Sequence, residues 1–186
     1  GGVGAAMALG WRFLDARSRE IGLGGGELAR IATIVPPAAR NIPPLEVLCD
    51  VNNPMTGPRG AARVYGPQKG ATPAMVEQLD AGLKHMAAVV YHTLGRRIDI
   101  PGGGAAGGLA AGAVAFLNAT LVSGSDAVMR ACRLDQALRG ADWVVLTTQM
   151  QDAAGGRFDY AGTDRHEAAR HGGKSDLCAA LLHREG

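Results

Sequence analysis

The chain has 186 residues, of which 47% are hydrophobic and 4% aromatic, and its formal net charge is +2 at pH 7. A chain of this length and hydrophobicity can bury a core, either as one domain or as a domain with part of another. The small charge and the absence of a basic stretch with interleaved aromatic residues argue against a nucleic-acid partner, and no apolar segment reaches the ~20 residues of a membrane-spanning helix.

The first part of the chain is predicted to hold one helix and several short extended segments. The opening residues are typical of a helix, and Ala32–Val35 indicates a short strand or turn that ends at Pro36. Leu45–Cys49 is an apolar run that stops at polar residues, which predicts a strand. Ala62–Tyr65 is predicted to form a further short strand.

Two helices are predicted in the middle of the chain. Thr72 suits the N-cap position and Pro73 the first helical position, and apolar residues then recur at helical spacing to about Gly95. The recurring residues are Val76, Leu79, Leu83, Met86 and Val90. Ala105–Leu117 predicts a second helix, whose small residues allow close packing.

Shorter elements are predicted toward the end. Ser125 is expected to cap a helix that ends near Leu134, and Asp135–Leu138 to form one more turn of helix. Trp143–Leu146 predicts a buried strand, the polar segment 150–175 is expected to be loosely ordered, and 176–182 is predicted to be a final helix. Strands that alternate with helices indicate an α/β protein.

The segment from Cys49 to Ala71 is the most informative part of the sequence. The predicted strand delivers Asp50, and asparagines 52 and 53 follow it directly. The loop then holds four glycines and three prolines, with Gln68 and Lys69 near its end. Glycine allows close backbone approach to a ligand and proline fixes turns, so such a loop can present amide N–H donors beside a cationic side chain. This pattern favours an anionic ligand.

Several separated motifs resemble the first-type glycerate kinase family. They are the glycine-rich start Gly1–Met7, the Asp50 and Asn53-Pro54 series, Gly-Pro-Gln-Lys-Gly-Ala at 66–71, Ala71-Thr72-Pro73, and the glycine-rich Pro101–Leu109. The resemblance covers Gly1 to about Leu146. Two departures stand out: Asn52 occupies a position where relatives usually have a second aspartate, and the family's Thr-Gly-Glu-Gly-Arg-x-Asp motif keeps only a similar second half at 156–159, without its glutamate.

The resemblance implies an α/β, glycerate kinase-like fold, with an inserted α/β domain and an incomplete Rossmann-like domain. The expected boundaries are 1–30 for the end of the first-domain segment, 31–140 for the inserted domain, and 141–186 for re-entry into the first domain with a diverged tail. It also implies that the chain is incomplete, so that the isolated chain is expected to lack activity, because positioning supplies most of the rate in phosphoryl transfer.

The implied activity is ATP-dependent phosphorylation of D-glycerate to 2-phosphoglycerate, with ATP and Mg²⁺ as cofactors and glycerate as the small-molecule partner. A carboxylate would orient the substrate hydroxyl or the metal, and a cation would neutralise phosphate or substrate charge. The candidates are Asp50 and Lys69 for catalysis, Asn52, Asn53 and Gln68 for substrate binding, and Gly102, Gly103 and Gly104 for phosphate binding.

Each candidate also has a structural interpretation. Asp50 can form a turn by bonding the backbone of the Asn52-Asn53 loop, and Lys69 can be a solvated surface group. Asn52, Asn53 and Gln68 can serve as caps or form turns. The glycines can serve close helix packing instead of an anion. The three cysteines lie far apart without paired metal-ligand spacing, which predicts reduced thiols and a cytoplasmic location.

Two alternatives of another kind remain at this point: a non-catalytic remnant that binds glycerate or phosphate, and a decayed product without a stable fold. A dinucleotide-dependent oxidoreductase is disfavoured, because the run Gly102–Gly108 follows no clear strand and lacks a well-placed acidic partner.

Overall fold

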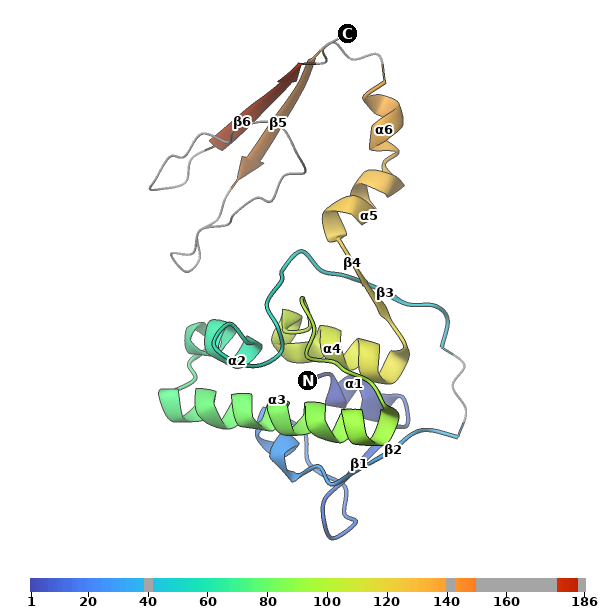
Figure 1. The fold of residues 1–186 in the computed structure, drawn as a ribbon, viewed down its shortest axis with the longest axis vertical. Helices are drawn as coiled ribbons and strands as arrows, with labels where there is room; N and C mark the ends of the chain where they lie inside the picture. Colours follow the sequence, from blue (N-terminus) through green and yellow to red (C-terminus); the bar gives the residue numbers. More distant parts are fainter. Residues whose placement is uncertain (39–41, 140–142, 150–176, 184–186) are drawn as a thin grey trace. The chain divides into compact units, whose positions relative to one another are not determined.

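The computed structural model describes residues 1–38, 42–139, 143–149 and 177–183. The chain divides into two compact units, Gly1–Val128 and Met129–Gly186. The fold of each unit can be followed in Figure 1. The boundaries expected from the sequence, after residues 30 and 140, remain predictions.

The first unit begins with a helix and an antiparallel strand pair. Helix α1 (Val3–Ala8) leads into β1 (Arg12–Leu14), and a 3-10 helix, η1 (Gly25–Arg30), precedes β2 (Thr33–Val35). Strands β1 and β2 pair with Phe13 opposite Ile34. The predicted opening helix and the strand before Pro36 are confirmed, while β1 and η1 had no clear sequence signal.

A parallel strand pair forms the framework for the candidate site. Strand β3 (Glu46–Leu48) pairs with β4 (Thr120–Val122). The pairing extends one residue beyond each end of β3, because the Thr120 amide donates to the Leu45 carbonyl and the Cys49 amide to the Val122 carbonyl. The predicted strand at Leu45–Cys49 is therefore confirmed.

Four helical segments connect the two parallel strands: α2 (Ala61–Tyr65), the 3-10 helix η2 (Pro67–Lys69), α3 (Pro73–Leu94) and α4 (Ala105–Leu117). In Figure 1 the long helix α3 lies beside α2 and η1, which both contact it. Parallel strands joined through helices confirm the predicted α/β class.

Helix α3 begins and ends as its sequence predicts. The Thr72 hydroxyl accepts a hydrogen bond from the Met75 amide at 3.3 Å, and Pro73 is the first helical residue. At the other end Gly95 adopts a left-handed conformation with φ of 66°. Four of the five apolar residues predicted for its inner face are buried, and Leu79 is partly buried.

Helix α4 has the predicted bounds, but its first turn is irregular. Ala106, Gly107 and Gly108 adopt left-handed φ and ψ values. Most residues of the following turns are buried, and the alanines and the glycine among them allow α1 to approach closely: a Cβ on Gly112 would lie 2.7 Å from the Gly2 Cα. Close backbone packing here replaces the large side chains that the composition lacks.

The strand predicted at Ala62–Tyr65 is wrong, because these residues form helix α2. Ala61 and Ala62 are buried by packing of α2 against α3 and α4. The helical conformation also lets Arg63 form a two-bond ion pair with Glu77 of α3, with both N···O distances at 2.7 Å. These tertiary contacts outweigh the weak strand preference of a four-residue segment.

Helix α5 (Gly124–Ala131) follows β4, and its cap differs from the prediction. Ser123, not Ser125, accepts the capping hydrogen bond, from the Asp126 amide to the Ser123 Oγ at 3.1 Å. The helix ends at Ala131 rather than near Leu134, and Arg133 has a left-handed φ of 52°. The predicted turn of helix beyond it is confirmed as α6 (Leu134–Ala137).

The second unit contains an antiparallel strand pair. Strand β5 (Trp143–Gln149) pairs with β6 (Leu177–His183), with Trp143 opposite His183 and Gln149 opposite Leu177. The strand predicted at Trp143–Leu146 is confirmed. The final helix predicted at 176–182 is wrong, because its backbone groups pair with β5 instead of with each other. The segment expected to be loosely ordered, 150–175, lies outside the described residues.

The core of the first unit centres on a small aromatic cluster. Trp11, Phe13 and Phe116 are almost completely buried, and both Trp11 and Phe13 contact the Phe116 ring edge-to-face, with ring centroids 5.1 and 5.2 Å apart. Within the part of the chain that the structure describes, no helix has the length and hydrophobicity needed to span a membrane.

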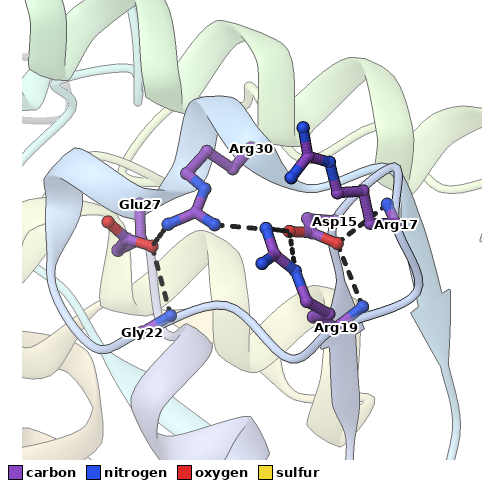
Figure 2. Close-up of polar contacts among 6 residues, drawn as sticks. All are labelled: Asp15, Arg17, Arg19, Gly22, Glu27 and Arg30. Atoms are coloured by element: carbon purple, nitrogen blue, oxygen red, sulfur yellow. Dashed lines mark hydrogen bonds and ion pairs between the residues drawn. The ribbon is translucent and has the colours of Figure 1, made fainter.

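Asp15 organises the turn after β1, as Figure 2 shows. Its Oδ1 accepts hydrogen bonds from the Arg17 and Arg19 amides at 2.9 and 3.0 Å, and its Oδ2 contacts the guanidinium groups of Arg19 and Arg30. The Arg19 amide is the largest cause that lowers the pKa of Asp15 to about 2; burial opposes it, and the Arg17 amide and the Arg19 side chain lower it further.

We predict that Asp15 makes the chain sensitive to acid. Its folded-state pKa of about 2 lies below the ordinary value of 3.8, so its stabilising contribution is present above about pH 4 and is lost as the pH falls through about 2. Asp15→Asn should therefore lower the free energy of unfolding at pH 6 and flatten its decline between about pH 4 and 2. Urea unfolding across this range checks the prediction.

Asp126→Asn is the matched control, because this exposed carboxylate has no ion pair among the described residues. If the free energy of unfolding declines equally steeply between about pH 4 and 2 in the wild type and in Asp15→Asn, Asp15 is not the source of the acid sensitivity.

Candidate functional site

Asp50 lies where the two parallel strands end. Its Oδ1 accepts hydrogen bonds from the Ser125 amide at 3.1 Å and from the Ser125 hydroxyl at 3.4 Å. Gly124 permits this approach, because a Cβ there would lie 2.5 Å from the Asp50 Oδ2. Ligands of open α/β sheets bind outside the carboxyl ends of the strands, so the exposed Asp50 carboxylate stands at a favourable edge. Among the described residues its side chain bonds the first turn of α5 and not the backbone of the Asn52-Asn53 loop, so the turn-forming interpretation of Asp50 is wrong and a helix-capping role takes its place.

Asn53 uses its side chain inside the loop. Its Nδ2 donates to the Arg59 carbonyl and its Oδ1 accepts from the Tyr65 hydroxyl, each at 3.0 Å. One bond ties Asn53 to the segment just before α2, and the other ties it to the last residue of α2. Asn52, in contrast, is exposed and has no hydrogen-bond partner among the described residues. Of the two asparagines, Asn52 therefore has the freer side chain for a ligand.

The glycines at 102–104 pack directly against the loop. The Gly104 amide donates to the Asn53 carbonyl and the Gly103 amide to the Ile100 carbonyl, both at 2.9 Å. The Cys49 thiol donates to the Gly102 carbonyl at 3.6 Å, which joins the same two segments. The amides of Gly103 and Gly104 thus already have acceptors within the chain. Phosphate binding by these glycines stays a prediction, and close packing is the role that the contacts support.

Gly104→Ala should therefore disrupt the loop. A Cβ at this position would collide with the Pro54 carbonyl and lie 2.9 Å from the Asn53 oxygen, and neither backbone group can move away as a flexible side chain would. We expect a loss of about 1–3 kcal/mol in the free energy of unfolding, the range for overpacked interiors. Urea unfolding measures the change. Gly4→Ala is the control for added bulk, because its Cβ would meet only the Leu23 side chain, at 3.8 Å, and its backbone is helical; a Gly104→Ala variant as stable as Gly4→Ala would contradict the steric account.

Gln68 and Lys69 occupy the short helix η2, and both are exposed. Gly70 follows with a left-handed φ of 85° and lets the chain turn away. Neither side chain has a hydrogen bond or ion pair within the described ranges. The structure therefore leaves the amide and the ammonium group free to meet a ligand, although no hydrogen bond or ion pair described there joins Lys69 to Asp50.

Two further carboxylates, which the sequence interpretation missed, hold the middle of the loop. Asp99 accepts hydrogen bonds from the Met55 amide at 2.9 Å, the Thr56 amide at 3.1 Å and the Thr56 hydroxyl at 2.6 Å. Asp80 accepts from the Gly57 amide at 2.9 Å. Three consecutive loop amides therefore donate to the protein's own carboxylates. One feature of the sequence pointed to this arrangement: Asp80 is an acidic residue among the apolar positions of the inner face of α3.

Asp80 is charged despite being 1% exposed. Burial raises its pKa, but hydrogen bonds from Lys84 and from the Gly57 amide, with the charges of Lys84 and Arg63, outweigh burial and lower the pKa overall. The Lys84 Nζ lies 2.8 Å and the Arg63 guanidinium 3.7 Å from the Asp80 Oδ2. The hydrogen bond to Glu77 is the main cause that raises the pKa of Arg63. The base of the loop is therefore a network of paired charges.

A metal ion at this site would be bound by one protein carboxylate and not by a preformed cluster of side chains. Within the described residues, no three His, Cys, Asp or Glu side chains are gathered as a metal site would need. Mg²⁺ in nucleotide-dependent enzymes is commonly held by one or two carboxylates together with substrate phosphates. The exposed Asp50 fits that mode of binding.

Comparisons with known proteins agree with these features. A model described as the glycerate kinase family matches residues 1–158, which extends past the predicted limit near Leu146. A glycerate kinase of Halalkalibacterium halodurans is 45% identical over 150 residues, and a glycerate 2-kinase of Escherichia coli K12 is 41% identical over 150 residues. Each alignment covers 78% of this chain and 39% of the relative, so the chain spans about two fifths of the length of these relatives.

A solved structure shows the same fold. The crystal structure assigned as glycerate kinase 2 from Salmonella typhimurium LT2 superposes with a TM-score of 0.70 at 42% identity, covering 76% of this chain and 39% of that one. The expected glycerate kinase-like α/β fold is thus confirmed. Taken with the match over residues 1–158, this likeness shows that the chain belongs to the glycerate kinase family.

Proposed function

We propose that this chain serves the ATP-dependent phosphorylation of D-glycerate to 2-phosphoglycerate. The observation that carries the proposal is the position of Asp50, an exposed carboxylate at the carboxyl end of a parallel strand, in a chain that belongs to the glycerate kinase family. The 2-phosphate is proposed because one relative, at 41% identity, is named a glycerate 2-kinase.

The proposed roles follow from which side chains are free. Asp50 orients the substrate hydroxyl or holds Mg²⁺, which would neutralise charge on the nucleotide phosphates. Lys69 meets the carboxylate of glycerate or a phosphate as a point charge. Asn52 and Gln68 donate hydrogen bonds to the substrate. Asn53 holds the loop in shape and does not contact the substrate, because its Nδ2 and its Oδ1 both form hydrogen bonds within the loop.

Removing the Lys69 charge should weaken D-glycerate binding. A hydrogen bond to a charged group contributes about 1.5–3 kcal/mol, which corresponds to roughly a 10- to 100-fold increase in the dissociation constant for Lys69→Ala. Titration calorimetry with D-glycerate measures this. Arg17→Ala is the matched control: it removes one exposed positive charge whose guanidinium has no partner in the described part of the chain. Equal weakening in both variants would indicate a general charge effect and contradict the role of Lys69.

A second candidate function is glycerate binding without turnover. It is favoured by the 39% coverage of the relatives, because phosphoryl transfer requires both substrates to be positioned together. An ADP-release assay with D-glycerate, ATP and Mg²⁺ separates the two. ADP release that Asp50→Ala abolishes would support phosphoryl transfer, whereas D-glycerate binding without ADP release would support the second function. Absence of D-glycerate binding to the wild type would overturn both functions.

A further inference from the structure

We infer that Asp99 and Asp80 are positioning residues that set the geometry of the glycerate-binding loop. Their carboxylates accept hydrogen bonds from the segment Met55–Gly57, which lies between Asp50 and the short helix η2 that carries Lys69. We call these hydrogen bonds the clamp. The inference rests on the proposed function, because it assigns these carboxylates to the same loop. Neither carboxylate is proposed to touch the substrate.

The clamp occupies backbone amides that could otherwise bind an anion. Consecutive backbone amides that point the same way form an anion-binding concavity. Here the amides of Met55, Thr56 and Gly57 donate to Asp99 and Asp80 at 2.9–3.1 Å. Since the chain's own carboxylates accept from these three amides, the amides are not free to bind glycerate, and the exposed side chains of Lys69, Gln68 and Asn52 are the donors that remain nearby in the loop.

The clamped segment is hydrogen-bonded to the neighbouring segments on both sides. The Met55 carbonyl accepts the Ala61 amide at 3.1 Å, which fixes the beginning of α2, and the Gly66 amide bonds the Ala62 carbonyl at 3.0 Å just before η2. On the other side, the Asn53 carbonyl holds the Gly104 amide. The segment that Asp99 holds is therefore bonded directly to the beginning of α2, and α2 leads on to the helix that carries Gln68 and Lys69.

Asp99 positions the loop without being needed for the core of the first unit. The side chain of Met55 is completely buried, so the loop keeps an anchor in the core when Asp99 is lost. The Asp99 contacts come from residues 43 and 44 positions away in the sequence and fix backbone rather than core packing. Loss of Asp99 should thus loosen the loop in a chain that stays folded.

The test uses Asp99→Ala, with Glu46→Ala as the control because Glu46 is an exposed carboxylate on β3 without a partner among the described residues. Two quantities are measured where urea melts show each variant fully folded: NMR hydrogen-exchange rates of the Met55 and Thr56 amides, and the calorimetric dissociation constant for D-glycerate. We expect Asp99→Ala to increase both at least about tenfold, and Glu46→Ala to leave both at wild-type values.

Thr56 provides milder variants if Asp99→Ala does not fold. Thr56→Ser keeps the hydroxyl that donates to the Asp99 Oδ2 and should behave as wild type, whereas Thr56→Val should speed exchange and weaken binding. Unchanged exchange in Asp99→Ala, or in Thr56→Val, would overturn the clamp, and faster exchange with unchanged affinity would overturn its positioning role. If the wild type fails to bind D-glycerate, the proposed function is overturned. The exchange rates alone then test whether Asp99 holds the Met55 and Thr56 amides.

Discussion

Replacing Phe116 by alanine should lower the free energy of unfolding by about 3–5 kcal/mol, the usual range for a buried phenylalanine. Phe116 is 2% exposed and contacts both Trp11 and Phe13 edge-to-face. Aromatic pairs of this kind contribute about 0.5–1.5 kcal/mol each beyond the area they bury. Because domains are stable by only about 5–15 kcal/mol, this variant should lose a large share of its stability.

Urea unfolding followed by tryptophan fluorescence measures this effect. Tyr91→Ala is the matched control, because Tyr91 is 47% exposed and its described ring contacts, with His92 and Arg97, lie at the surface. We expect less than about 1 kcal/mol for this control. A Phe116→Ala variant that unfolds at the same urea concentration as Tyr91→Ala would refute the aromatic core of the first unit.

Asp50→Ala should weaken D-glycerate binding roughly 10- to 100-fold, because it removes a charged acceptor at the carboxyl edge of β3. It also releases the Ser125 amide and hydroxyl at the beginning of α5. Since Asp50 is exposed, water can replace the lost acceptor, and the stability cost should stay near the ~1 kcal/mol of a lost cap.

Calorimetry and urea unfolding together separate these two effects. Asp50→Asn is the informative second variant, because its amide oxygen can still accept from the Ser125 amide while the charge is lost. Wild-type affinity in both Asp50 variants would leave Asp50 with its capping role alone and remove it from the site.

The elements that the sequence predicts correctly are those with local signals. Helix α3 has a capping threonine, a proline at its first position, periodic apolar residues and a terminal glycine, all within one continuous segment. Strand β3 lies within the mainly apolar segment Leu45–Cys49, which is followed by polar residues. In both cases the residues that determine the structure are neighbours in the sequence.

The errors arise where distant residues decide. Helix α2 is stabilised by its contact with α3, including the ion pair of Arg63 with Glu77, 14 positions away. Strand β6 exists through its pairing with β5 across a long segment, although its alanines and leucines favour a helix. Short segments carry too little intrinsic preference to resist such contacts.

The candidate site follows the same rule. The sequence places Asp50 correctly at a strand end, but whether an amide side chain faces a ligand or the loop depends on tertiary partners such as Tyr65 and Arg59 for Asn53. Likewise, the loop amides donate hydrogen bonds as predicted, but their acceptors are Asp99 and Asp80, which are distant in the sequence, and not a ligand. Lys69 stays a prediction, favoured by its exposure.

The most direct test of the account is to map D-glycerate binding by amide chemical shifts in the isotope-labelled chain. We predict saturable changes concentrated at residues 50–53 and 66–70, with little change in the arginine-rich turn around Asp15. No saturable change, or changes confined to that arginine-rich turn, would contradict the claim that the Asp50-to-Lys69 loop is a glycerate site.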